Sequence, residues 1–391
     1  LISAMNRLKT RGNTLVVGEH EEAVMRAADC LVDMGPGSGR EGGRLVYSGA
    51  PDRIAEVPES LTGAFLSGRR RISIPQKRRK PRKFLQISGA TRHNLKKLDV
   101  NIPLGVFACL TGVSGSGKST LAHDVVYLNA LVAKGGVCEE EPAHVKSVKG
   151  WELLDEVVMV DQSPIVRTPR STPAVYSGVF EEIRALFADT ETARARGMKP
   201  GFFSFNSGDG RCPRCMGMGS EKVEMQFLSD IFVQCPLCHG ARYGNEVLSV
   251  YRDGRNIADV LGMTVTAALE YFGGEKGARA RRIAEKLGVL RRVGLGHLTL
   301  GQPLNTLSGG ENQRLKLAKI LLDQMGSGKN NPKMLILDEP GTGLHFADIE
   351  VLLAVFRELV EQGHTLLVIE HNPEFIESAD YVIDLGPEGG A

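Results

Sequence analysis

Four cysteines in two Cys-x-x-Cys pairs are the residues of this chain best suited to hold a metal. Cys212 pairs with Cys215 and Cys235 with Cys238, and nineteen residues separate the two pairs. Each pair presents two thiolates on one turn and is followed by glycine, which suits tetrahedral Zn²⁺. A redox or disulfide role is the alternative. The spacing predicts a structural zinc site, and His239, one residue further on, is expected to be a bystander.

A glycine-rich loop earlier in the chain predicts phosphate binding. It follows an apolar, β-prone run at 106–111 and precedes a helix-like run at 119–128. In this order backbone N–H groups and a helix dipole face the phosphates, whereas the alternative is a glycine-rich turn that binds nothing. Lys118 is expected to reach the β and γ phosphates, and Ser119 to hold Mg²⁺. The expected ATP contacts of the loop are Gly112, Val113, Ser114, Gly115, Ser116, Gly117, Lys118, Ser119 and Thr120.

Two adjacent carboxylates end a second apolar run, Met334 to Leu337. A buried strand that delivers two acids to its end can place one on a metal and leave the other to polarise water. We assign Asp338 to the Mg²⁺ shell, where it also contacts ATP, and Glu339 as the general base. A solvated strand end is the alternative, but Lys118 upstream favours the catalytic interpretation.

The sequence Ser308-Gly309-Gly310-Glu311 begins a helix-like run. Serine at the N-cap and glutamate three residues later form a capping box. The two glycines leave a helix start that could also receive a γ-phosphate from across an interface.

An internal repeat divides the chain. Residues 12–20 recur at 363–371, an offset of 351 positions, including the pair Glu19-His20 as Glu370-His371. The repeat predicts that a longer parent protein carries two copies of one unit. We expect the tail of the first copy at 1–60, a basic linker at 61–85 and the second copy at 86–391, with an inserted module at about 125–300.

These motifs together resemble the ABC ATPase family: a P-loop, Leu-Ser-Gly-Gly-Glu, a strand-end Asp-Glu pair and a histidine after a strand. The resemblance implies an α/β fold of the P-loop ATPase class with a large inserted α+β module. It implies that Ser308, Gly309 and Gly310 close the ATP site of a facing unit. His371 and, in the first copy, His20 match the switch histidine, and Gln162 matches the Q-loop position. A lone histidine is more often structural, but the repeated Glu-His pair favours the switch role.

Longer strings give a narrower resemblance, to the C-terminal half of the UvrA family of DNA damage-recognition ATPases. They include Thr91–Lys97, Asp161–Pro164, Phe203–Asn206 and Asp384–Gly390. The resemblance implies a homodimer that binds ATP, Mg²⁺, Zn²⁺ and distorted double-stranded DNA in nucleotide excision repair and the SOS response. It also implies a helicase-like partner of the UvrB type, and ATP hydrolysis with no nuclease site of its own.

Two alternatives to that function stay open. Gly341 stands where the family usually has threonine, which favours a UvrA-like paralogue for tolerance of DNA-binding drugs. A transporter's nucleotide-binding subunit is the other, and the zinc module and basic linker disfavour it.

Basic residues between the Q-loop position and the cysteines are the expected DNA contacts. They suit phosphate contacts without base readout, as a sensor of distorted shape requires, although a solvated face is the alternative. Phe202, Phe203 and Phe205 behind them are expected in the core. The linker, without an acidic residue from Ser60 to Leu98, is either a solvated tether or a phosphate-contacting strap. The expected contacts are Arg167, Arg170, Arg194, Arg196 and Lys199.

Composition excludes few classes of protein. The net charge of +2 and 24% charged residues are ordinary, and no run of about 18 apolar residues could span a bilayer. Cys30, Cys109 and Cys138 lie scattered, which indicates a reducing compartment. We expect a cytoplasmic protein, and a fragment, because the chain begins without methionine.

Overall fold

The structure is a computed structural model, and it describes residues 1–35, 42–165, 168, 170–223, 225, 231–327 and 332–386. The chain forms two compact units, one made of Leu1–Gln162 with Gly328–Ala391 and the other of Ser163–Ser327. Each unit is considered separately below. No helix among the described residues is long and apolar enough to cross a membrane. The domain boundaries inferred from the sequence stay a prediction.

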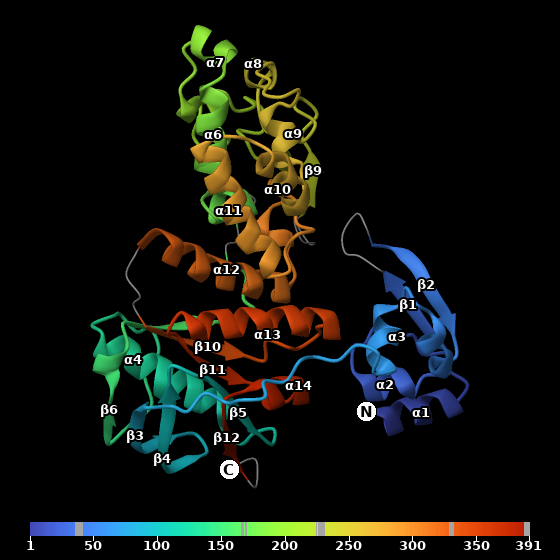
Figure 1. Ribbon diagram of the computed structural model, residues 1–391, viewed down its shortest axis with the longest axis vertical. Coiled ribbons are helices and arrows are strands. Elements are labelled where there is room, and N and C mark those ends of the chain that lie inside the picture. The colour runs from blue at the N-terminus through green and yellow to red at the C-terminus, as the bar shows by residue number, and fades with distance from the viewer. Residues whose placement is uncertain are drawn as a thin grey trace. The chain divides into compact units, whose positions relative to one another are not determined.

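A five-stranded sheet forms the centre of the first unit (Figure 1). Its hydrogen-bonded neighbours are all parallel. Parallel sheets are buried on both faces, which explains the continuous apolar runs of these strands. The predicted strands at 106–111, 157–160 and 334–338 are confirmed as β5, β7 and β10. The order is β12 (Tyr381–Leu385), β5 (Phe107–Gly112), β11 (Thr365–Ile369), β10 (Lys333–Asp338) and β7 (Glu156–Val160).

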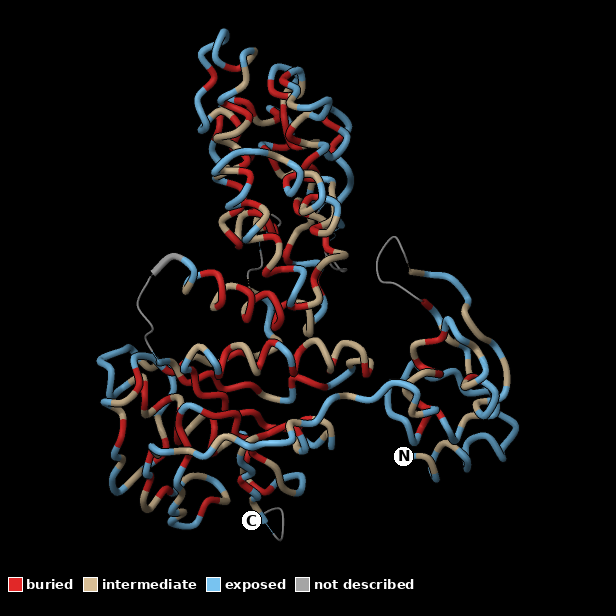
Figure 2. The backbone as a smooth tube through the Cα atoms, in the orientation of Figure 1, coloured by how far each residue is buried: buried red, intermediate tan, exposed pale blue. Residues whose placement is uncertain are grey.

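Helices and a second, antiparallel sheet complete this core. Leu110, Val125 and Ile336 are fully buried members of one apolar cluster, and Trp151 packs against it. Figure 2 shows the buried backbone concentrated in the central strands. The other elements are β3 (Lys83–Arg92), β4 (Leu95–Leu104), β6 (Ser147–Lys149), α4 (Leu128–Ala133), η4 (Trp151–Leu153), α13 (Phe346–Glu361) and α14 (Pro373–Ser378).

The helix predicted after the P-loop has an unusual type. Residues Thr120–Tyr127 form a π-helical segment, η3, which α4 continues. Leu121, Val125 and Val126 of η3 are completely buried, so packing against the sheet holds this wider helix. Segments of π-helix are rare and occur frequently at functional sites.

The N-terminal segment folds around a small cluster of its own. Met25, Ile54 and Leu66 pack with Phe346 of α13, and the ring of Phe65 stacks on Phe346 at 5.4 Å between centroids. These contacts attach the segment to the ATPase core of the same unit. Its elements are α1 (Ile2–Thr10), α2 (Glu22–Arg26), β1 (Leu31–Gly35), β2 (Arg44–Gly49), η2 (Pro51–Glu56) and α3 (Leu61–Leu66).

The two copies of the repeat differ at their central strand. Residues 365–369 form β11, which is buried throughout, whereas the matching residues 14–18 form no strand. Leu15, Val16 and Val17 are 39%, 96% and 49% exposed. The same apolar pattern is therefore a strand only where neighbouring strands enclose it.

The basic linker makes specific contacts with the ATPase core. The Arg78 guanidinium donates to the Ala379 carbonyl at 2.9 Å, and the Arg79 N–H donates to Asp380 Oδ1 at 2.9 Å. Arg79 also pairs with Glu361 at 3.2 Å. These residues are bound to the surface rather than forming a free tether.

The second unit is mainly helical, with one two-stranded hairpin. Phe203 and Phe205 are completely buried and Phe202 is half-buried, so the prediction of core phenylalanines is confirmed for the first two. Its elements are α5 (Pro173–Tyr176), α6 (Val179–Ala188), α7 (Glu191–Ala195), η5 (Pro200–Phe203), β8 (Ser220–Val223), β9 (Ile231–Gln234), α8 (Asn245–Leu248), α9 (Ile257–Leu261), α10 (Val265–Gly273), α11 (Ala278–Arg292), η6 (Leu304–Thr306) and α12 (Gly309–Ser327).

Candidate functional site

The polar residues expected to handle ATP in the first unit follow the carboxyl ends of neighbouring parallel strands. The P-loop follows β5, Asp338 ends β10 and Glu339 follows it, Gln162 follows β7, and His371 follows β11. The carboxyl ends of parallel strands meet at one edge of a sheet, which is the usual ligand site of α/β folds. Four segments far apart in the sequence therefore meet at one edge.

The P-loop has the geometry of a phosphate cradle. Gly117 has φ +97°, and a Cβ there would lie 2.8 Å from Leu95 Cδ2, so glycine is required. Lys118 is 7% exposed, and its Nζ donates to the carbonyls of Gly112 at 3.0 Å and Val113 at 2.9 Å. The buried Ser116 hydroxyl has no hydrogen-bond partner among the described residues. A buried polar atom without a partner suits a ligand oxygen, so the loop fits a nucleotide phosphate.

Asp338 lies where a metal-binding carboxylate is expected. Burial raises its pKa, as does the negative charge of Glu339, while the Ser119 hydroxyl and Lys118 lower it. Ser119 and Asp338 are thus close neighbours, as they must be to share one Mg²⁺ shell. A hard oxygen pair of this kind fits Mg²⁺.

Glu339 has a strained backbone and functional neighbours. Its φ is +44°, a left-handed conformation that costs a residue with a Cβ about 1 kcal/mol and often marks an active site. His371 Nε2 lies 3.6 Å from Glu339 Oε1, and Gln162 Nε2 donates to the Glu339 carbonyl at 3.2 Å. The structure therefore places the predicted base, switch histidine and Q-loop glutamine side by side.

Sequence reasoning gave no role to two further residues at this edge. Glu370 is 4% exposed, burial raises its pKa, and it contacts the loop after Glu339. Asn94 donates from Nδ2 to the Gly115 carbonyl at 2.6 Å, which braces the P-loop. The repetition of Glu before His in both copies was a signal that could have identified Glu370.

The Ser-Gly-Gly-Glu motif belongs to the second unit and starts α12. The Ser308 N–H donates to Glu311 Oε2 at 2.8 Å, and the Glu311 N–H donates to Ser308 Oγ at 3.3 Å, so the predicted capping box is confirmed. His297 Nε2 lies 2.7 Å from Glu311 Oε1. Its hydrogen bond lowers the pKa of Glu311 to about 2, with help from Ser308 and against burial.

His20, the switch histidine of the first copy, is exposed in the first unit. It lines a cavity of about 560 Å³ together with Gly341, Gly343 and Asn372. Its role in an ATP site stays a prediction.

The four cysteines of the second unit form one buried cluster. Their sulfur atoms all lie within 4.8 Å of one another, with 4.0 Å between Cys212 and Cys235 and 3.6 Å between Cys215 and Cys238. Four sulfurs at 2.3 Å from one Zn²⁺ would be about 3.8 Å apart, whereas a disulfide needs about 2 Å. The cluster fits a tetrahedral thiolate metal site and no disulfide.

Both cysteine turns repeat one backbone shape. Met216 and Gly217 follow the first pair with φ +50° and +84°, and His239 and Gly240 follow the second with +47° and +85°. A Cβ on Gly217 would lie 1.7 Å from the Phe205 carbonyl oxygen, so the fold requires glycine there. His239 is exposed and outside the metal-binding cluster of the described residues.

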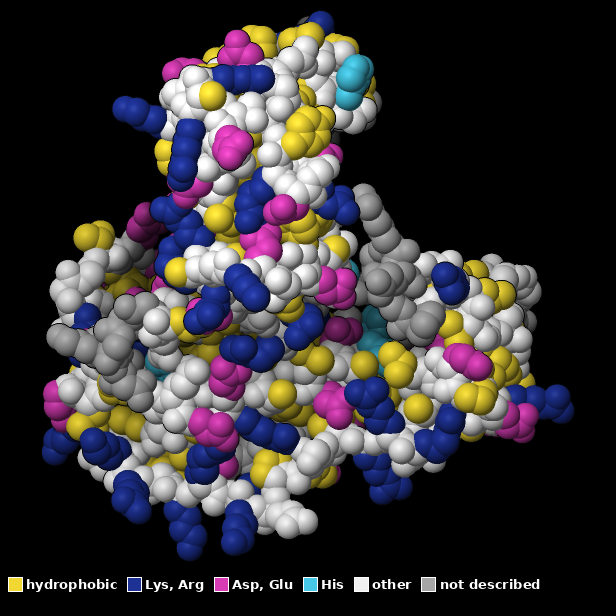
Figure 3. All heavy atoms as spheres, turned by 45° about the horizontal axis from the view of Figure 1, so that its top comes forward, with side chains coloured by type: hydrophobic (Ala, Val, Ile, Leu, Met, Phe, Trp, Pro, Cys, Tyr) yellow, Lys and Arg dark blue, Asp and Glu magenta, His cyan; other side chains and the backbone are white. Residues whose placement is uncertain are grey.

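The expected DNA contacts have different environments. Arg167 lies outside the described residues. Arg194 pairs with Asp189 at 3.4 Å, Arg196 donates to Ser249 Oγ at 2.7 Å, and Arg170 is half-buried. On the described atoms of the face in Figure 3, Lys and Arg side chains are interspersed with acidic ones rather than forming one continuous patch.

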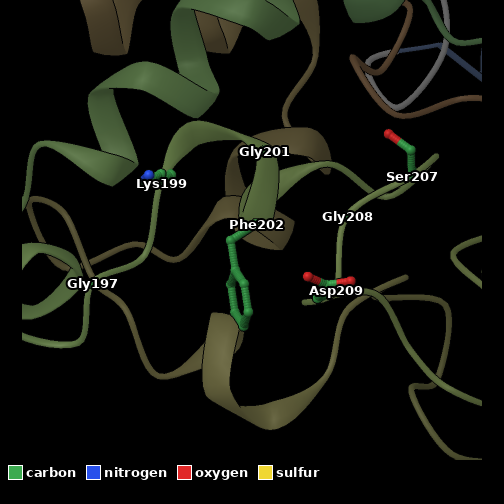
Figure 4. Close-up of a pocket in the computed structure, with 7 residues that line it drawn as sticks. All are labelled: Gly197, Lys199, Gly201, Phe202, Ser207, Gly208 and Asp209. Carbon is green, nitrogen blue, oxygen red and sulfur yellow. The ribbon is translucent and has the colours of Figure 1, made fainter.

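Lys199 lies at a small open cavity of about 380 Å³ in the second unit. Its side chain has no hydrogen-bond partner among the described residues. Phe202 and Asp209 also line the cavity, and Figure 4 shows the Phe202 ring between the segment of Gly197 and Lys199 and the loop of Asp209. Lys199 is therefore available for a phosphate contact.

The fold and the ATP site define an ABC-type ATPase domain. The family model described as "ABC transporter" matches residues 95–342. The whole chain is similar to UvrABC system protein A, with 50% identity in Bacillus subtilis and 52% in Thermus thermophilus. The chain therefore belongs to the ABC family and, within it, to the UvrA proteins.

A solved structure and the lengths of the relatives complete the comparison. "Crystal structure of UvrA2 from Deinococcus radiodurans" matches 100% of this chain and 46% of that chain, with a TM-score of 0.88 and 45% identity. The chain spans 40% of the length of the Bacillus subtilis and Thermus thermophilus relatives. These full-length relatives disfavour the transporter alternative.

Proposed function

We propose that this chain carries an ATP-hydrolysing unit of a DNA damage-recognition protein of nucleotide excision repair. The meeting of Lys118, Asp338, Glu339 and His371 at one sheet edge supports the ATPase part. The printed name of the relatives supports the repair part, because their system is named UvrABC.

Each residue at the ATP site has a distinct proposed role. Lys118 releases its bonds to the P-loop carbonyls and binds the β and γ phosphates, while Ser119 and Asp338 hold Mg²⁺, which neutralises phosphate charge when bound. Glu339 accepts a proton from the attacking water. Gln162 and His371, in contact with Glu339, orient that water and sense the γ-phosphate. Ser308, Gly309 and Gly310 complete the site of a facing unit, and His20 belongs to the first copy's site.

The zinc module and the basic residues have the proposed task of holding distorted duplex. Zn²⁺ bound by Cys212, Cys215, Cys235 and Cys238 is architectural, because four thiolates leave no open coordination position. Arg170 and Lys199 contact phosphates, which gives affinity without sequence preference. We further propose a homodimer in the cytoplasm that passes damaged DNA to a helicase-like partner of the UvrB type.

A titration of full-length protein with damaged and undamaged duplex at several salt concentrations tests the DNA part. We expect tighter binding to damaged duplex, and a salt slope that Lys199→Ala reduces by about 0.9, the value for one lost phosphate contact. Arg53→Ala, which removes the same charge from an exposed site of the first unit, is the control. Equal affinity for both duplexes would contradict the proposal.

A UvrA-like paralogue for tolerance of DNA-binding drugs is the second candidate, favoured by the likeness to the UvrA2 structure. The two candidates differ in one step. Failure of the full-length protein to load the repair helicase at a lesion, with DNA binding intact, would favour the paralogue.

A further inference from the structure

Glu370 is a buried carboxylate that no step of the proposed ATP chemistry uses. It ends the central strand β11 directly before His371, and its side chain is 4% exposed. Taking a carboxylate out of water is unfavourable unless several donors surround it. Its hydrogen bonds therefore indicate what the residue does.

One carboxylate bridges two loops. Glu370 Oε1 accepts a hydrogen bond from the Gly341 N–H at 2.5 Å, and Oε2 accepts from the N–H groups of His371 at 2.9 Å and Asn372 at 3.2 Å. Gly341 lies two residues after Glu339. The same side chain thus binds the loop of the proposed base and the loop of the proposed switch histidine.

The residue at 341 is fitted to this contact. A Cβ on Gly341 would lie 2.5 Å from Glu370 Oε1 and 2.6 Å from Phe375 Cε2. Real Cβ atoms do not approach other atoms so closely, so a larger residue would displace the carboxylate or the ring. Glycine at 341 lets its own N–H reach the buried carboxylate.

The first copy of the repeat separates the local from the bridging contacts. Glu19 Oε2 accepts from the N–H groups of His20 at 2.8 Å and Glu21 at 3.3 Å, which repeats the pair made by Glu370. That pair belongs to the turn itself, because it forms even where the glutamate is exposed. The bond to Gly341 is the addition, and it joins the two catalytic loops.

We propose that Glu370 is a positioning residue that holds the loop of Glu339 and the loop of His371 in register for ATP hydrolysis. The inference rests on the proposed roles of these two residues. Glu370 itself touches neither nucleotide nor water and acts through the backbone. Its loss should lower kcat, because a shift of about 1 Å at a reacting group can reduce the rate a hundredfold. It should leave ATP affinity unchanged, because Lys118 and the P-loop are not involved.

The test uses the full-length protein and the part of its ATP turnover that Lys118→Ala removes, which isolates this site. We expect Glu370→Ala to lower kcat at least tenfold while KM and the affinity for an ATP analogue change less than twofold. Glu377→Ala, an exposed glutamate on α14, is the matched control and should leave turnover unchanged. Hydrogen exchange should be faster at the amides of Gly341, His371 and Asn372.

Glu370→Gln keeps the volume but replaces one acceptor with an amide donor, so it should lose part of kcat. It decides the question if the alanine variant does not fold. Turnover within twofold of wild type in the folded variant would overturn the inference, as would a matched loss of kcat and ATP affinity. Full activity of Glu339→Gln would instead refute the assignment of the base, and with it the proposed function.

Discussion

Glu311→Gln should destabilise the second unit through the loss of one charge. The change keeps the size of the side chain, and glutamine is accepted at this position of a capping box. The pKa of Glu311 is about 2 against an ordinary 4.5. At 1.36 kcal/mol for each pKa unit this difference corresponds to about 3 kcal/mol. Glu311 is 17% exposed, so solvent screens the interaction little, and the error of about one pKa unit gives an expected loss of about 2 to 3 kcal/mol.

Differential scanning calorimetry of the 391-residue chain measures this loss. For a unit of this size, 1 kcal/mol moves Tm by about 2 to 4 °C, so we expect the second unit's transition to fall by about 4 to 12 °C at pH 7. Trp151, the only tryptophan, lies in the first unit, and the transition followed by its fluorescence should not move. Because the folded-state pKa is lowered, the stabilisation is complete above pH 4.5 and disappears only as the pH falls towards 2. The gap between wild type and variant should therefore be equal at pH 7 and pH 5.5. A gap under 1 °C at pH 7, or an equal shift of the tryptophan transition, would refute the reasoning.

Three further predictions concern the metal, the nucleotide and pH. Cys215→Ser should lose bound zinc, measured by elemental analysis, and unfold the cysteine module with a loss on the order of 10 kcal/mol of binding energy; full zinc content would contradict this. Lys118→Ala should weaken ATP binding at least tenfold in equilibrium dialysis, since the buried ammonium is the loop's one side-chain cation; unchanged affinity would contradict its role. Burial lowers the pKa of His345, so the folded state binds its proton less readily than the unfolded state, and stability should fall as pH drops below about 6.5. In denaturant titrations followed by Trp151 fluorescence, His345→Gln should reduce this loss between pH 7.5 and 5.5, and an unaltered loss would exclude His345 as a contributor.

The parts of the site that sequence could predict are those set by neighbours along the chain. Lys118 and Asp338 each follow an apolar run directly, so the end of a strand fixed their place. The cysteine turns were predictable because ligand spacing within a turn is local. The capping box of Ser308 and Glu311 needs only one helical turn.

The parts that escaped depend on contacts between distant segments. The bond from Gly341 to Glu370 joins residues that are brought together only by the order of β10 and β11 in the sheet. The π-helix after the P-loop comes from packing under β3 and β7 and leaves no mark in periodicity. Arg79 reads as a linker charge, yet its partners Glu361 and Asp380 lie about 300 residues away.

The exposed segment at 14–18 has a practical consequence for handling the chain. Its leucine and valine side chains face solvent, and among the described residues no backbone hydrogen bond involves it. An apolar stretch with open N–H and C=O groups is a template on which another chain can add as a strand. We therefore expect this chain, purified alone, to self-associate through its N-terminal segment as concentration rises. Val16→Lys should raise the solubility limit without altering the ATP site.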